Sequence, residues 1–165
     1  MFTIASDNKK PTDNPVYALI IGVSNYETYD ASGALNLPGA THDANIWQAY
    51  CENTLGLGAS SLQKLTDDSG TEATSRQRII EALKWLGQQL GKQEKVNGAS
   101  ALLTFSGHGL TLEGVGSDNI AEGLSLALAP SDIDKGLSQA LLFSHIEEIL
   151  FNAVVHTRFD TTTPS

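Results

Sequence analysis

The sequence of 165 residues is poor in cysteine, in basic residues and in long apolar runs. Its one cysteine, Cys51, cannot form an internal disulfide, so a reducing cytoplasm is the expected location. The formal net charge of -9 argues against nucleic acid as the main partner, because phosphate backbones bind clustered Lys and Arg. An anionic membrane surface is disfavoured for the same reason, and no apolar run approaches the roughly 20 residues that span a bilayer.

Motifs for metals and cofactors are also missing. The four histidines show no metal-ligand spacing, and a single cysteine excludes thiolate zinc sites. Asp132 and Asp134 lack the glycine and the terminal glutamate of a calcium loop. The segment 56–58 lacks the third glycine of a dinucleotide-binding loop, and no G-x-S-x-G elbow occurs. We therefore expect no metal and no cofactor.

Two nearly continuous apolar segments, residues 16–23 and 99–105, are present. Their lack of alternation predicts strands that are buried on both faces of a sheet. Helical spacing of apolar residues predicts helices over 41–55, 74–90 and 144–156, and shorter strands are expected at 62–65 and 124–128. Strands that alternate with helices predict an α/β fold, a three-layer α/β/α sandwich around a mainly parallel sheet.

The expected organisation is one domain with two polar ends. Residues 1–15 contain two prolines and read as a flexible lead-in, 16–160 form the domain, and 161–165 form a polar tail. The glycine-rich stretch 111–123 is expected to be a mobile loop. Both long strands run into polar loops, after Val23 and after Phe105, and these loops should lie at the same edge, where α/β sheets bind ligands.

The tetrapeptide Ser106-Gly107-His108-Gly109 follows the second long strand. A histidine held at a strand's carboxyl end can work as a general base or acid near neutral pH. The flanking glycines would allow unusual backbone torsion angles, and the Gly109 N–H could point at a developing oxyanion. Taken alone, the pattern also fits a loop histidine without a chemical task.

Four segments in order resemble the caspase, metacaspase and paracaspase superfamily of cysteine peptidases. They are ALIIGVSNY at 18–26, LPGATHDA at 37–44, LLTFSGHG at 102–109 and LAPSD at 128–132. The resemblance implies that the substrate is a protein or peptide and that His108 is the histidine of a Cys–His dyad. It implies that Gly109 supplies an oxyanion donor and that Ser24, Asn25 and Tyr26 line the substrate cleft. For Asp43, which matches an acidic residue of the family, stabilisation of a helix N-terminus is the plainer role.

The family's nucleophile is the feature that the sequence lacks. In the family that cysteine follows the next core strand, about 50 residues after the histidine, and here the position falls in the polar tail. Cys51 has apolar neighbours at helical spacing and reads as a small core residue. We therefore expect this chain to lack the cysteine-bearing strand, to be inactive alone, and to need the C-terminal part of the peptidase from the same gene or a second chain.

Two functions remain open at this point. One is a cysteine endopeptidase, and the other is a catalytically dead caspase-like module with an interaction or regulatory role. For the first, the resemblance implies that the loop after the first strand helps to wall the pocket for the residue before the cut. The loop from Gly22 to Gly39 holds Glu27 and Asp30 but no Lys or Arg, which favours a basic residue there. A sensor or activator protein is a further candidate partner that only the resemblance suggests.

Overall fold

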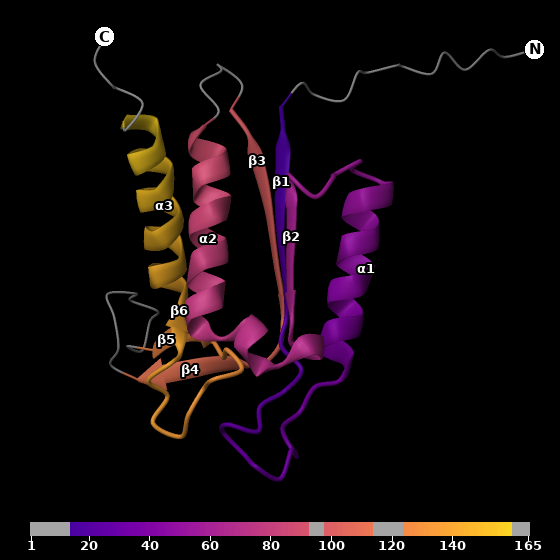
Figure 1. Ribbon diagram of the computed structural model, residues 1–165. Helices are drawn as coiled ribbons and strands as arrows, with labels where there is room; N and C mark the ends of the chain where they lie inside the picture. The colour runs from indigo at the N-terminus through magenta and orange to yellow at the C-terminus, as the bar shows by residue number, and fades with distance from the viewer. Residues whose placement is uncertain (1–13, 93–97, 114–123, 160–165) are drawn as a thin grey trace, which may run out of the picture.

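The computed structural model describes residues 14–92, 98–113 and 124–159 (Figure 1). Its strands and α-helices are, in chain order, β1 (Val16–Gly22), α1 (Gly39–Asn53), β2 (Leu62–Thr66), α2 (Arg76–Gly91), β3 (Ser100–Ser106), β4 (Gly109–Glu113), β5 (Leu124–Leu128), β6 (Leu141–Leu142) and α3 (Phe143–Phe159). Two short 3-10 helices, η1 (Asp67–Ser69) and η2 (Thr71–Thr74), join β2 to α2. The predicted polar tail, most of the lead-in and most of the 111–123 loop lie outside the described residues.

The central sheet has the strand order β2-β1-β3, and all of its strands are parallel. β1 is the middle strand, and its residues Ala18, Leu19, Ile20 and Ile21 are at most 1% exposed. Their burial on both faces explains the continuous apolar sequence of β1.

Helices cover both faces of this sheet, which confirms the predicted three-layer α/β architecture (Figure 1). α1 packs on one face, where Ala44 and Cys51 meet Ala18 and Ile20 of β1. α2 packs on the other face through the buried residues Ile79, Leu83 and Leu86. α3 lies beside α2 on that same side and contacts β5 and β6.

α2 and α3 run in the same direction and approach closely at two glycines. A Cβ built on Gly87 would lie 2.6 Å from Cβ of Ala153, and one built on Gly91 would lie 2.7 Å from Cβ of Thr157. Because α2 connects two parallel strands, it returns from their carboxyl ends to their amino ends. α3 therefore also ends at the edge where the strands of the sheet begin (Figure 1).

Two expectations about the elements are wrong. The segment 111–113 belongs to strand β4 of a second, antiparallel sheet with the order β4-β5-β6. The β3 strand is not buried on both faces, because its residues are half-buried or exposed. Among the described residues, no strand lies on the side of β3 away from β1.

Candidate functional site

The loops after β1 and β3 meet at the carboxyl edge of the sheet, as the sequence predicts. The Val23 N–H donates to the Ser106 carbonyl at 2.9 Å, which extends the β1–β3 ladder to the end of β3. The chain then turns through Gly107 and His108 into β4. This turn places the Ser-Gly-His-Gly segment against the loop that follows β1.

The imidazole of His108 is oriented by a backbone carbonyl of that loop. Its Nε2 lies 2.8 Å from the carbonyl oxygen of Leu35. A carbonyl can only accept a hydrogen bond, so Nε2 is the donor, and in the neutral form of the ring the lone pair lies on Nδ1. Nδ1 has no hydrogen-bond partner among the described residues, which leaves it able to accept a proton from another group.

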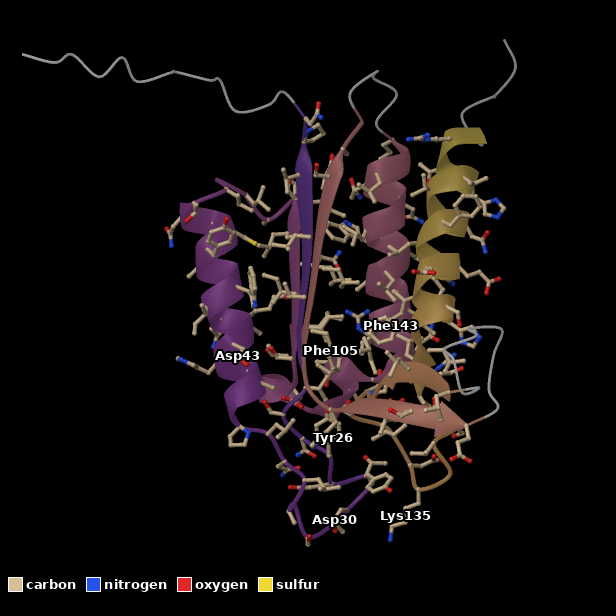
Figure 2. All side chains as sticks on the ribbon, turned by 180° about the vertical axis from the view of Figure 1, so that it is seen from behind. Tyr26, Asp30, Asp43, Phe105, Lys135 and Phe143 are labelled. Carbon is tan, nitrogen blue, oxygen red and sulfur yellow. The ribbon has the colours of Figure 1, made fainter. Side chains whose placement is uncertain are left out.

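Tyr26 contacts both the ring and the backbone of His108. Its ring centroid lies 4.6 Å from that of His108 in an edge-on contact. The Tyr26 hydroxyl accepts from the His108 N–H at 2.8 Å and donates to the Ala129 carbonyl at 3.2 Å. Tyr26 is 2% exposed, and burial above all raises the pKa of its hydroxyl to about 12. Figure 2 shows Tyr26 below Phe105, at the carboxyl end of the sheet.

Gly107, directly before His108, occupies a position where only glycine fits. A Cβ on Gly107 would lie 2.6 Å from the Tyr26 hydroxyl and 2.8 Å from the Phe105 ring, so only glycine fits there. Neither Gly107 nor Gly109 has the left-handed φ that the sequence reading allowed for. Close packing, and not an unusual torsion angle, is what requires Gly107.

Gly109 is exposed, and its surroundings are open. A Cβ at this position would meet only the Ala127 carbonyl oxygen, at 3.9 Å. The Ala129 N–H donates to the His108 carbonyl at 3.0 Å, so the next pair of the antiparallel ladder, Gly109 with Leu128, is one that does not exchange hydrogen bonds. The Gly109 N–H therefore points away from β5.

The loop after β1 is fixed by the start of η1. One carboxylate oxygen of Asp67 accepts from the N–H groups of Ser24 and Asn25 at 2.7 and 2.6 Å. The Ser24 hydroxyl lies 2.8 Å from that of Thr41 and accepts from the Thr41 N–H, which ties the loop to the first turn of α1. The sequence alone assigns no role to Asp67. The signal that could have pointed to it is an acidic residue close to the end of a short predicted strand.

The predicted substrate-lining residues thus differ in what they contact. The Ser24 side chain is engaged with α1, and the Asn25 side chain accepts from the Glu27 N–H at 2.9 Å. Only Tyr26 reaches His108 directly.

A cavity of about 170 Å³ opens next to His108. Its walls are mostly apolar and come from the loop after β1, from β4 and from the segment after β5: Tyr26, Tyr29, Leu35, Leu110, Ala129 and Ile133. Within the described residues, the site therefore combines a histidine whose Nδ1 has no hydrogen-bond partner, a backbone N–H that points away from β5, and an apolar cavity.

Cys51 is remote from this site. It is fully buried in the last turns of α1, near the amino edge of the sheet, whereas His108 lies at the carboxyl edge. Burial, and to a lesser extent Glu52, raises the pKa of its thiol. The thiol is therefore a core group, as expected from its neighbours.

Asp43 does not stabilise the helix N-terminus, contrary to the sequence reading. α1 begins at Gly39, and no acidic residue lies in its first turn. Asp43 is exposed on α1 (Figure 2).

Among the described residues, no group of three or more His, Cys, Asp or Glu side chains could hold a metal ion. In the same part of the chain, no helix is both long and apolar enough to cross a bilayer.

The α/β fold, a parallel sheet with helices on both faces, is compatible with the class of caspase-like cysteine peptidases. A family model described as metacaspase, peptidase C14 domain matches residues 17–160. The chain therefore belongs to this family. No curated protein shows a significant match to the sequence.

Proposed function

We propose that this chain is the histidine-bearing part of a caspase/metacaspase-type cysteine endopeptidase. In the proposed reaction a cysteine thiol gives its proton to Nδ1 of His108, and the sulfur attacks the peptide carbonyl carbon. The carbonyl oxygen becomes an oxyanion, towards which the Gly109 N–H donates. His108 then passes the proton to the leaving amine as the C–N bond breaks, and water hydrolyses the thioester.

The observation that carries this proposal is the contact between Nε2 of His108 and the Leu35 carbonyl oxygen, at 2.8 Å. The carbonyl orients the ring so that Nδ1 can take the proton of a thiol. A general base must be within hydrogen-bond reach of the proton that it takes, and its orientation must be set beforehand.

The nucleophile is proposed to arrive on a strand beside β3, from residues outside this sequence or from a second chain. The outer side of β3 is open among the described residues, and a parallel strand there would end next to His108. Connections between parallel strands are right-handed, and β2 reaches β3 through α2. A right-handed connection from β3 to a strand on its outer side would cross the same face of the sheet as α2 does. α3 lies on that face and ends at the edge of the sheet where such a strand would begin.

A basic residue before the cut is part of the proposal. Asp30 accepts from the N–H and the hydroxyl of Ser32, and these hydrogen bonds lower the pKa of its carboxyl. Glu27 is exposed in the same loop. Two carboxylates and no cation between Gly22 and Gly39 favour a Lys or Arg side chain over Asp. A cytoplasmic location also belongs to the proposal, because one cysteine can form no internal disulfide.

The test is turnover of a fluorogenic peptide library, with the chain alone and with the coding sequence that follows it or with a co-expressed product of a neighbouring gene. We expect no turnover by the chain alone, and cleavage after Lys or Arg by the complete enzyme. His108→Ala should lower kcat/KM about 10³-fold or more with the fold intact. His145→Ala, on the exposed surface of α3, is the matched control and should leave the rate unchanged.

Three results would contradict parts of this proposal. Turnover by the chain alone that disappears in Cys51→Ala would make Cys51 the nucleophile. A preference for Asp over Lys and Arg would contradict the assigned specificity. Absence of turnover in every combination would favour the alternative, a catalytically dead caspase-like module that regulates or recruits other proteins.

A further inference from the structure

The β4–β5 ladder is interrupted at His108. The register pairs Gly109 with Leu128, so His108 stands opposite Ala129 at the end of the ladder. A hydrogen-bonded antiparallel pair exchanges two bonds, one in each direction. Here the Ala129 N–H donates to the His108 carbonyl at 3.0 Å, but the His108 N–H donates to the Tyr26 hydroxyl at 2.8 Å. The hydroxyl donates in turn to the Ala129 carbonyl at 3.2 Å, so it stands in the place of the second bond.

We propose that Tyr26 is a positioning residue for His108, because its hydroxyl holds the end of the ladder open and so sets the backbone and the ring of the histidine. The proposal rests on the proposed function in so far as His108 is catalytic. Two hydrogen bonds through the hydroxyl join the His108 N–H to the Ala129 carbonyl, where an ordinary ladder has one direct bond. Loss of the hydroxyl therefore lets the strands close and draws His108 towards Ala129. The imidazole then leaves the Leu35 carbonyl.

The surroundings of the hydroxyl are built for this contact. Gly107 is required because a Cβ there would lie 2.6 Å from the Tyr26 hydroxyl oxygen. The Tyr26 N–H donates to Oδ1 of Asn36 at 2.8 Å, and Asp67 holds the two preceding N–H groups of the loop. The tyrosine is therefore fixed at its backbone and at its hydroxyl.

The first test uses the chain itself and does not depend on catalysis. In the wild-type protein, NMR should show a slowly exchanging Tyr26 hydroxyl proton with a nuclear Overhauser effect to the His108 amide. Tyr26→Phe should speed amide exchange at His108 and change the imidazole ¹⁵N signals from the fixed Nε2–H form to a mixture of tautomers. Tyr50→Phe is the matched control, since Tyr50 is 44% exposed near the end of α1 and is remote from His108.

The second test uses the complete enzyme. Tyr26→Phe should lower kcat about 10²-fold with little change in KM, because a small misplacement of the base slows the chemical step more than it weakens binding. Gly107→Ala should have the same effect, because it displaces the hydroxyl without removing it.

Three outcomes would overturn the inference. They are an absent Tyr26–His108 contact in the wild-type spectrum, unchanged His108 signals in Tyr26→Phe, and a kcat of Tyr26→Phe equal to that of the control Tyr50→Phe. If Tyr26→Phe fails to fold, the wild-type spectrum and Gly107→Ala still decide the matter. A complete enzyme without any turnover would contradict the proposed function, while the NMR tests would still confirm or refute the positioning of His108.

Discussion

The neighbouring strands β1 and β3 have similar sequences but different surroundings. Each has seven residues, VYALIIG and SALLTFS, and they pair in register along their whole length. In β1 five of the seven residues are buried, whereas in β3 none is. The difference comes from position, because β1 has a strand on each side and β3 has one only on the side of β1 among the described residues.

This comparison shows that β3 is more apolar than its position in the described chain requires. Edge strands of soluble proteins usually carry charges, prolines or bulges that prevent pairing with other chains. β3 has no charged residue and no proline. Its sequence is thus that of an inner strand, which supports the proposal that another strand lies beside it in the complete enzyme.

The largest difference between the two strands should appear in a matched pair of truncations. Leu19 of β1 is fully buried and stands opposite Leu103 of β3, which is half-buried. Leu19→Ala should lower the free energy of unfolding by about 2–5 kcal/mol, because it removes packed atoms and leaves a cavity. Leu103→Ala should cost about 1–2 kcal/mol, since part of that side chain stays in water. Urea unfolding followed by circular dichroism measures both.

Equal losses for the two variants would contradict the comparison. They would mean that Leu103 is already fully covered in the isolated chain, either by a second copy or by residues outside the described part. Unfolding at two protein concentrations separates these cases, because only self-association makes the midpoint depend on concentration.

Amide hydrogen exchange should show the open edge residue by residue. The Ser100 N–H donates to the Pro15 carbonyl, and the Ser106 carbonyl accepts from Val23, so Leu102 and Thr104 between them also bond to β1. The N–H groups of Leu103 and Phe105 then face the open side. We expect exchange at these two positions to be at least about a hundredfold faster than at Leu102 and Thr104. Uniform protection along β3 would show that its outer edge is paired.

Burial of β1 and the placement of the site could be predicted from the sequence, because both depend on local pattern. A continuous apolar run followed by a polar glycine-containing loop predicts β1. The same pattern at β3 predicts that His108 lies at the edge of the sheet that also holds Tyr26. The same reasoning failed for the burial of β3, since a strand's sequence reflects the complete sheet and not only the neighbours that this chain provides.

Other parts of the site could not be predicted because they depend on contacts between distant segments. His108 is oriented by the backbone carbonyl of Leu35, and every residue has such a carbonyl, so the sequence carries no sign of this contact. The need for glycine at position 107 follows from a tyrosine 81 positions earlier in the chain, and only the folded structure brings the two together. Strand β6 has two residues and directly precedes α3, so it is too short to produce a pattern.

The smallest effect is expected on α1, where the two faces repeat the contrast between β1 and β3. Ile46 is 56% exposed, next to Trp47 and Leu102, whereas Ala44 is 1% exposed against β1. Ile46→Gln should change the free energy of unfolding by no more than about 0.5 kcal/mol, because the isoleucine loses little contact with water when the chain folds. Ala44→Gln is the matched control and should cost about 1–3 kcal/mol by overpacking, since this Cβ already lies 2.9 Å from where a Cβ on Gly22 would be. A loss above about 1 kcal/mol in Ile46→Gln would mean that something covers this face of α1 in solution, and its dependence on protein concentration would show whether that is a second copy of the chain.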